Sequence, residues 1–286
     1  MKFLKLIFIV PILITFAVMS GTTFSGCTKS KIDTIYVPHD STIYVYDTTT
    51  VRDTVYDITS GLVAYYNFNG GNLNDSSGYN NNIVFSNATP TTDRNGKANN
   101  AYLFNGTSSY MDVTNSPSLN PDNITLYAIV KVNGFYYGTD HANFILAKGW
   151  DGDAGTYYMD FTDFQSYGLP DTTHEFFGSA YGDNNDPFGS AAGVTDSVTQ
   201  ITTGTWYKLA YTYDGFTCKY YVNGVLITTA SKSVTFTPNS LDLYIGKNED
   251  PNSLFPYWLN GAIDEIRIYN RALPQQAITE LVNLTN

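Results

Sequence analysis

Two dipeptides, Asp214-Gly215 and Asn223-Gly224, constrain the fold more than any other feature of this 286-residue sequence. Each one interrupts an alternating run of residues within the stretch from Trp206 to Thr229. Alternation with a period of two places every second side chain on the same face of a β-strand, and Asp-Gly or Asn-Gly between two such runs favours a tight hairpin turn. The sequence therefore predicts a three-stranded antiparallel meander over residues 206–229.

Short runs of the same kind recur along the chain after residue 60. Charged residues make up 14% of the sequence, against roughly 25% in ordinary soluble domains, which disfavours long charged helices and coiled coils. Only residues 274–284 have a helical pattern, in which Pro274 comes first and Ala277, Ile278, Leu281 and Val282 share one face. We therefore expect an all-β fold, a two-sheet antiparallel sandwich with one short C-terminal helix. The further strand candidates are residues 62–68, 101–104, 109–113, 124–132, 143–148, 156–161, 242–246 and 262–269.

Residues 1–26 have the pattern of a signal peptide. Lys2 and Lys5 precede an uncharged apolar run, and the small residues before Cys27 resemble the lipobox of bacterial lipoproteins. In that family the Cys becomes the lipidated first residue, so the resemblance implies an outer-membrane lipoprotein that faces the periplasm or the cell surface and contacts the membrane through its lipid anchor alone. An ordinary secretory signal followed by a chance Cys is the alternative.

Residues 27–60 form a predicted extended stalk rich in Thr, Asp and Tyr. It cannot bury much without a partner, and the absence of a Leu seam argues against a coiled coil. Each of its Asp-Ser/Thr units resembles the O-glycosylation motif that one group of Gram-negative bacteria uses on exported proteins. Simple low complexity explains the pattern equally well. The candidate glycosylated residues are Thr34, Ser41, Thr48 and Thr54.

Residues 61–286 resemble the laminin-G-like, concanavalin A-like jelly roll. The resemblance implies a two-sheet jelly-roll sandwich, whereas it leaves function open, because this fold hosts lectins, adhesion modules, enzyme appendages and glucanases. The motifs that carry it are Gly61 to Phe68 with Asp75-Ser76-Ser77-Gly78, Ala101 to Gly106, Tyr110 to Val113, the meander from Trp206, Leu243 to Gly246, and Asn260 to Leu273.

The net charge and the positions of the acidic residues exclude some classes of function. The formal net charge of −11 excludes nucleic acid as an expected partner. Glucanases of this fold place Glu, Asp and Glu at alternate strand positions, and no such Glu-x-Asp-x-Glu run occurs here. We therefore expect a non-catalytic, lectin-like module that binds glycan. A protein-binding adhesion or structural module is the alternative, and a glycoside hydrolase is a third.

The same resemblance implies a structural calcium ion. Family members often hold Ca²⁺ between the first loop and the Asp of the closing motif, which here implicates Asn72, Asp75, Gly78 and Asp264. Hard cations prefer such oxygen ligands. The alternative is that Asp75 caps a turn and Asp264 faces solvent.

Two long segments, residues 133–155 and 163–197, combine aromatic rings with Asn and Asp, as a sugar site requires. The alternative is that their rings pack the segments onto the sandwich. Trp206 and Trp258 lie in family motif positions and are predicted to be core residues. The predicted ligand-binding residues are Trp150, Asp151, Asp153, Tyr181, Asp183 and Asn184.

Replacing Cys27 with Ser tests the anchor. Because the thiol is the atom that accepts the lipid, we expect Cys27→Ser to move the protein from the membrane fraction to the soluble fraction. Fractionation of cells and immunoblotting measure the partition. Unchanged partitioning of the variant would contradict lipidation at this residue.

Overall fold

The computed structural model describes residues 31–35, 43–47, 56–135, 142–149, 157–162, 175–180, 194–196, 199–234, 237–248 and 256–284. The chain divides into two compact units, Met1–Val55 and Tyr56–Asn286. In the first unit, β1 (Lys31–Ile35) pairs with β2 (Ile43–Asp47) in an antiparallel hairpin. The predicted extended stalk therefore contains a strand pair. Cys27, Ser41, Thr48 and Thr54 lie outside the described residues, and Thr34 lies in β1.

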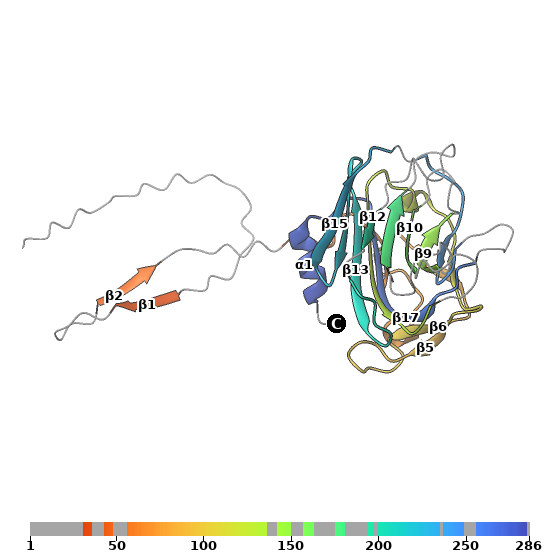
Figure 1. Cartoon of the computed structure of the whole chain (residues 1–286), viewed down its shortest axis with the longest axis horizontal. Helices are drawn as coiled ribbons and strands as arrows, with labels where there is room; N and C mark the ends of the chain where they lie inside the picture. The colour runs from red at the N-terminus through yellow and green to blue at the C-terminus, as the bar shows by residue number, and fades with distance from the viewer. Residues whose placement is uncertain are drawn as a thin grey trace, which may run out of the picture. The chain divides into compact units, whose positions relative to one another are not determined.

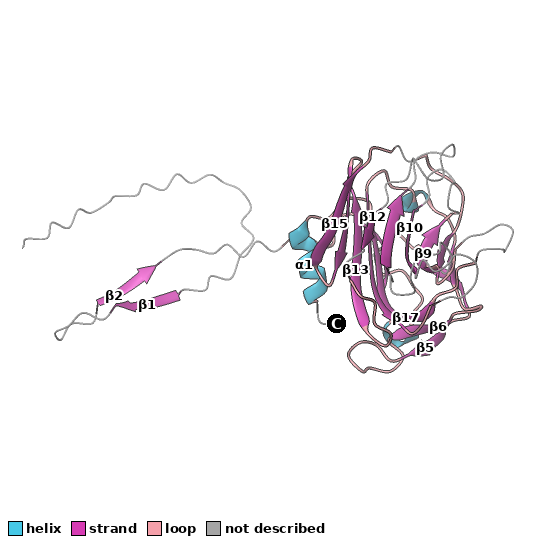
Figure 2. Cartoon of the chain, in the orientation of Figure 1, coloured by secondary structure: helices cyan, strands magenta, loops and turns pink. Residues whose placement is uncertain are grey.

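The second unit is a sandwich of two antiparallel sheets, which confirms the predicted jelly-roll architecture (Figures 1 and 2). One sheet has seven described strands in the order β12 (Val194–Asp196), β11 (Glu175–Ala180), β10 (Tyr157–Thr162), β9 (Asn143–Lys148), β16 (Leu243–Ile245), β7 (Met111–Val113) and β4 (Ile83–Ser86). The other has eight, in the order β15 (Val225–Ser231), β14 (Thr217–Val222), β13 (Trp206–Tyr213), β8 (Ile124–Val132), β17 (Asn260–Tyr269), β6 (Ala101–Asn105) and β5 (Thr89–Thr91), with β3 (Leu62–Tyr66) also paired to β17.

The predicted meander is present as β13, β14 and β15. At its first turn the Asp214 carboxylate accepts hydrogen bonds from the backbone N–H groups of Phe216 and Thr217. At the second turn, Asn223 and Gly224 have φ angles of 51° and 82°. Positive φ at both central residues defines the type I′ hairpin, so the turn residues act as the sequence predicts.

The only described α-helix, α1 (Gln275–Asn283), follows Pro274 as predicted. Its buried residues, Ala277, Ile278 and Leu281, pack against outward-facing side chains of the eight-stranded sheet such as Tyr127 and Ile129. This sheet is therefore covered on both faces near the helix (Figure 1). Short 3₁₀ turns lie at Asn69–Gly71 and Pro117–Leu119. Within the described part of the chain, no helix is both long enough and apolar enough to cross a membrane.

Residues 56–62, which we call the entry segment, join the layer that α1 forms. The compact unit thus begins at Tyr56, five residues before the predicted boundary at Gly61. The side chains of Tyr56, Ile58 and Leu62 pack against the same apolar cluster as the helix. The backbone contacts are Tyr56 N–H to Glu280 Oε1 (2.7 Å), Tyr269 OH to the Ile58 carbonyl (2.9 Å), Arg271 Nε to the Ser60 carbonyl (2.8 Å) and Arg271 Nη2 to the Asp57 carbonyl.

Both Trp residues predicted as core are half-exposed instead, so that prediction is wrong. Tyr207 and Leu209 point into the core, and alternation therefore places Trp206 on the outer face of its sheet. There the Lys131 ammonium lies 5.6 Å from the centre of the Trp206 ring. Trp258 lies over the other sheet, 6.1 Å from the ring of Tyr110.

Removing the entry segment tests its contribution. A fragment of residues 61–286 lacks the Tyr56 and Ile58 side chains and all four residues of the segment that form these hydrogen bonds. We expect it to lose about 2–4 kcal/mol in the free energy of unfolding relative to residues 56–286. Urea denaturation measures the difference. A fragment of residues 51–286 is the control and should match residues 56–286. Equal stability of all three fragments would show that the entry segment contributes nothing.

Candidate functional site

The six predicted ligand-binding residues, Trp150, Asp151, Asp153, Tyr181, Asp183 and Asn184, lie outside the described residues. The strands that precede them are described. Lys148, at the end of β9, and Ala180, at the end of β11, are both paired with Tyr157 of β10. The two segments therefore leave the seven-stranded sheet at the same end. That they share one site stays a prediction.

Asp75, one of the predicted calcium ligands, organises its own loop. Its Oδ1 accepts hydrogen bonds from the backbone N–H groups of Tyr65 and Ser77, at 2.9 and 2.8 Å. Its Oδ2 accepts hydrogen bonds from the Ser77 hydroxyl and the Asn81 N–H, at 2.7 and 3.0 Å. Asn72 Oδ1 likewise accepts a hydrogen bond from a backbone N–H within the loop. Both side chains stabilise the turn that ends at Gly78, where φ is +94°.

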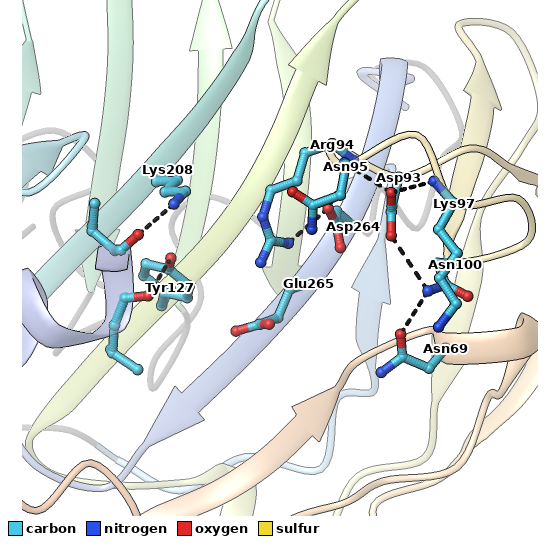
Figure 3. A network of polar contacts seen from close by, with 12 residues as sticks. Asn69, Asp93, Arg94, Asn95, Lys97, Asn100, Tyr127, Lys208, Asp264 and Glu265 are labelled. Atoms are coloured by element: carbon cyan, nitrogen blue, oxygen red, sulfur yellow. Dashed lines mark hydrogen bonds and ion pairs between the residues drawn. The ribbon is translucent and has the colours of Figure 1, made fainter. Parts of the chain in front are cut away.

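Asp264 is held by a different group of residues, on the outer side of the eight-stranded sheet (Figure 3). Its Oδ2 accepts hydrogen bonds from Arg94 Nη1 at 2.7 Å and from the Arg94 backbone N–H at 3.1 Å. Burial raises the pKa of Asp264, and the hydrogen bonds from Arg94 oppose that rise. Beside this ion pair, the Asp93 carboxylate accepts hydrogen bonds from the Asn95 and Lys97 N–H groups and from the Asn100 amide.

The first loop and the Asp93 turn beside Asp264 are connected through Asn100, whose amide donates hydrogen bonds to Asp93 and Asn69 and whose Oδ1 accepts one from the Gly70 N–H (Figure 3). No hydrogen bond or ion pair among the described residues joins Asp264 to Asn72, Asp75 or Gly78. The described residues also hold no cluster of three or more His, Cys, Asp or Glu side chains placed to bind a metal. Calcium binding stays a prediction, and unfolding temperatures measured in calcium and in a chelator decide it.

The outer face of the seven-stranded sheet carries a row of side chains that sequence reasoning did not single out. In the strand register, Phe85 of β4 lies directly opposite Asp112 of β7, and Asp112 lies directly opposite Tyr244 of β16. Met111 and Ile245 point into the core, so alternation turns Asp112 and Tyr244 outward. The row therefore places a carboxylate between two aromatic rings on adjacent strands.

More rings and a cation surround this row. The Tyr110 ring lies 4.9 Å from Phe85, 6.0 Å from Tyr244 and 6.1 Å from Trp258, measured between ring centres. The Lys247 ammonium lies 4.0 Å from the centre of the Tyr244 ring and 4.6 Å from that of Tyr110. Phe85 is 44% exposed, and the other three rings are half-buried. We call this set the platform: Phe85, Tyr110, Asp112, Tyr244, Lys247 and Trp258.

Asp112 is the chemically distinctive member of the platform. Its Oδ1 is buried and accepts no hydrogen bond from the described residues. Burial raises the pKa of Asp112, the nearby Asp242 carboxylate raises it further, and Lys247 opposes the rise. A carboxylate that has lost water without gaining donors destabilises the folded state, and such groups concentrate at functional sites. Because Oδ1 has no exposed surface, a hydroxyl or N–H donor of a ligand would reach this carboxylate through Oδ2.

Backbone strain lies beside the platform as well. Tyr257 has a φ of +47°, which is uncommon for a large residue. Its ring stacks on Phe144 of β9 at 5.3 Å with an interplanar angle of 11°, and its carbonyl accepts a hydrogen bond from the Phe144 N–H. These contacts hold the strained residue and position the adjacent Trp258 over Tyr110. Strain held in place by surrounding contacts is typical of functional sites.

The sequence matches the model of a known protein family. A family model, Laminin_G_3, described as the concanavalin A-like lectin/glucanases superfamily, matches residues 105–279. The chain belongs to this family. The match confirms the resemblance stated for the motifs between residues 105 and 279. No curated protein matches the chain.

Solved structures of this lectin/glucanase fold resemble the chain at low identity. The binding domain of Paraclostridial Mosquitocidal Protein 1 has a TM-score of 0.60 and 18% identity, over 79% of this chain and 52% of that one. Domain 4 of AbnA, an arabinanase from Geobacillus stearothermophilus, was solved with arabinotriose and has a TM-score of 0.54 and 22% identity, over 78% and 98%. The binding domain of botulinum neurotoxin DC was solved with SialylT and with rat synaptotagmin II, with TM-scores of 0.57 and 0.59 and identities of 12% and 14%, over 79% and 52% in both cases. The chain thus spans about half of the toxin binding domains.

The ionisation of Asp112 makes stability depend on pH. Because its pKa is raised in the folded state, the folded state loses stability relative to the unfolded chain as the pH rises from the ordinary carboxyl pKa through the folded-state value. We expect Asp112→Asn, which stays neutral, to unfold at a higher temperature than the wild type at about pH 7 and at an equal temperature at about pH 3. Calorimetry at both pH values measures this. A variant that is less stable at neutral pH would contradict a desolvated carboxylate.

Proposed function

We propose that residues 56–286 form a non-catalytic carbohydrate-binding domain that uses the platform. The observation that carries this proposal is the Asp112 carboxylate, without a hydrogen-bond donor from the described residues, between the Phe85 and Tyr244 rings. The complexes of AbnA domain 4 with arabinotriose and of the neurotoxin DC binding domain with SialylT support it.

The chemistry of the platform suits a sugar. A pyranose or furanose ring has an apolar face of C–H groups, which packs on a flat aromatic ring, and a rim of hydroxyl groups, which need fixed donors and acceptors. Phe85 supplies an exposed flat surface, Tyr110 and Tyr244 add rings over which the Lys247 ammonium lies, Asp112 supplies the acceptor and Lys247 a donor. The non-catalytic role fits neighbours that are themselves binding domains. Release of reducing ends from a bound glycan would overturn it.

The cellular setting is also part of the proposal. Lipidation at Cys27 anchors the protein in the outer membrane, on the periplasmic or the surface side, and residues 28–55 separate the anchor from the binding domain. Protease treatment of intact cells distinguishes the two sides, because the enzyme reaches the domain only if it faces outward.

Protein binding is the alternative function. The neurotoxin DC binding domain was also solved with rat synaptotagmin II, and apolar side chains are exposed next to the platform, including Val84 at 64%. Competition separates the two functions: a free saccharide displaces a glycan from the platform and leaves a protein partner bound.

Replacing Tyr244 with Ala tests the platform. The ring is half-buried against Tyr110, so we expect the domain to fold and to lose about 1–3 kcal/mol of binding free energy for the glycan that a polysaccharide array identifies. Isothermal titration calorimetry measures the loss. Phe216→Ala is the matched control, because Phe216 is 61% exposed in a turn of the other sheet. Equal losses of affinity in the two variants would show that the platform does not bind the glycan.

A further inference from the structure

We infer that the platform binds consecutive internal units of a polysaccharide chain that lies across the strands and leaves the domain over the β4 edge. A single terminal sugar is the other kind of ligand that a carbohydrate site of this type takes. The inference rests on the proposed function and specifies its ligand class.

The platform is longer than one sugar ring. Phe85, Asp112 and Tyr244 lie on three adjacent strands, and neighbouring strands are about 4.8 Å apart. The row therefore spans roughly 10 Å perpendicular to the strands. Tyr110 bridges the row, since its ring contacts both Phe85 and Tyr244. Aromatic surface is thus continuous over a length that accommodates more than one unit of a chain.

The β4 end of the platform is open. β4 is the last strand in the order of the seven-stranded sheet, and among the described strands it pairs only with β7. Its residues Val84 and Phe85 are 64% and 44% exposed, the highest values for large apolar side chains in this sheet. A ligand that stacks on Phe85 therefore meets no described strand beyond it.

The charged groups of the platform lie away from its β4 end. Asp112 and Lys247 flank Tyr244, whereas the exposed side chains at the β4 end, Val84 and Phe85, carry no hydrogen-bonding group. Recognition of a terminal sugar requires donors and acceptors for the hydroxyl groups that only a chain end has. An apolar, open end instead accepts the ring face of any further unit, and this favours internal binding.

A chain-length series tests the inference. Arabinan, xylan, galactan, mannan and mixed-linkage β-glucan are first bound to residues 56–286, and calorimetry then compares oligosaccharides of one to six units of each polysaccharide that binds. We expect the hexasaccharide to bind at least about tenfold more tightly than the monosaccharide, because it covers both ends of the platform. Blocking both ends of the hexasaccharide should leave its affinity unchanged. Equal affinity for one and six units, or loss of binding on end-blocking, overturns internal binding while carbohydrate binding stands.

Replacing Phe85 with Ala tests whether the β4 end of the platform contacts the longer oligosaccharide. The side chain is exposed, so the variant should fold, and we expect about a tenfold loss of affinity for the hexasaccharide with no change for the disaccharide, which the rings of Tyr110 and Tyr244 accommodate. Phe216→Ala serves again as the control. An unchanged hexasaccharide affinity in Phe85→Ala contradicts an exit over β4. If none of the five polysaccharides binds, the proposed function fails and this inference fails with it.

Discussion

The long antiparallel pairing of β17 with its neighbours is the constraint on which the rest of this structure depends. One side of β17 pairs with β8 along nearly its whole length, and the other side pairs first with β6 and then with β3. Ile266 and Ile268 point into the core, while Arg267 and Tyr269 point outward. A register shift between Ile263 and Glu265 interrupts this alternation. The strand thus connects the first and last parts of the domain sequence through one hydrogen-bonded ladder.

β17 carries charged side chains in buried positions, and each of these charges has a partner. Glu265 and Arg267 are 2% and 6% exposed, and the Arg267 Nε donates to Glu265 Oε1 at 2.6 Å. The Arg267 guanidinium also lies 4.2 Å from the centre of the Tyr65 ring on β3. A buried charge without a partner is strongly destabilising, so these pairings are a condition for placing charges there at all. Asp264 meets the same condition through Arg94.

Local signals in the sequence predict the fold well, because turns and alternation depend on neighbouring residues. Asn223-Gly224 supplies two positive φ angles and Pro274 precedes the helix, as expected. Contacts between distant residues were not predictable in the same way. The ion pair of Arg94 with Asp264 joins positions 170 residues apart. The predicted stalk includes residues 56–60, whereas contacts with the C-terminal residues incorporate them into the domain.

The candidate site also depends on contacts between distant residues, and for this reason the sequence alone did not predict it. Phe85, Asp112 and Tyr244 are far apart in the sequence, and they form a row only through the strand order β4-β7-β16. The sequence does show that Asp112 is polar between two apolar residues, which is the usual pattern of a solvent-facing strand position. It does not show that aromatic rings lie on either side. Their register is a consequence of long-range pairing, which single-sequence patterns leave open.

The two outer faces of the sandwich differ in the residues that lie on them. The outer face of the eight-stranded sheet is covered by α1 and the entry segment, whose apolar side chains share one cluster. The outer face of the seven-stranded sheet holds a smaller apolar cluster around Phe144, Tyr158 and Tyr257, and beside it Asp112 has a buried carboxylate oxygen that accepts no hydrogen bond from the described residues. Because the chain enters the domain within the α1 layer, its attachment point and the platform lie on opposite faces of the sandwich.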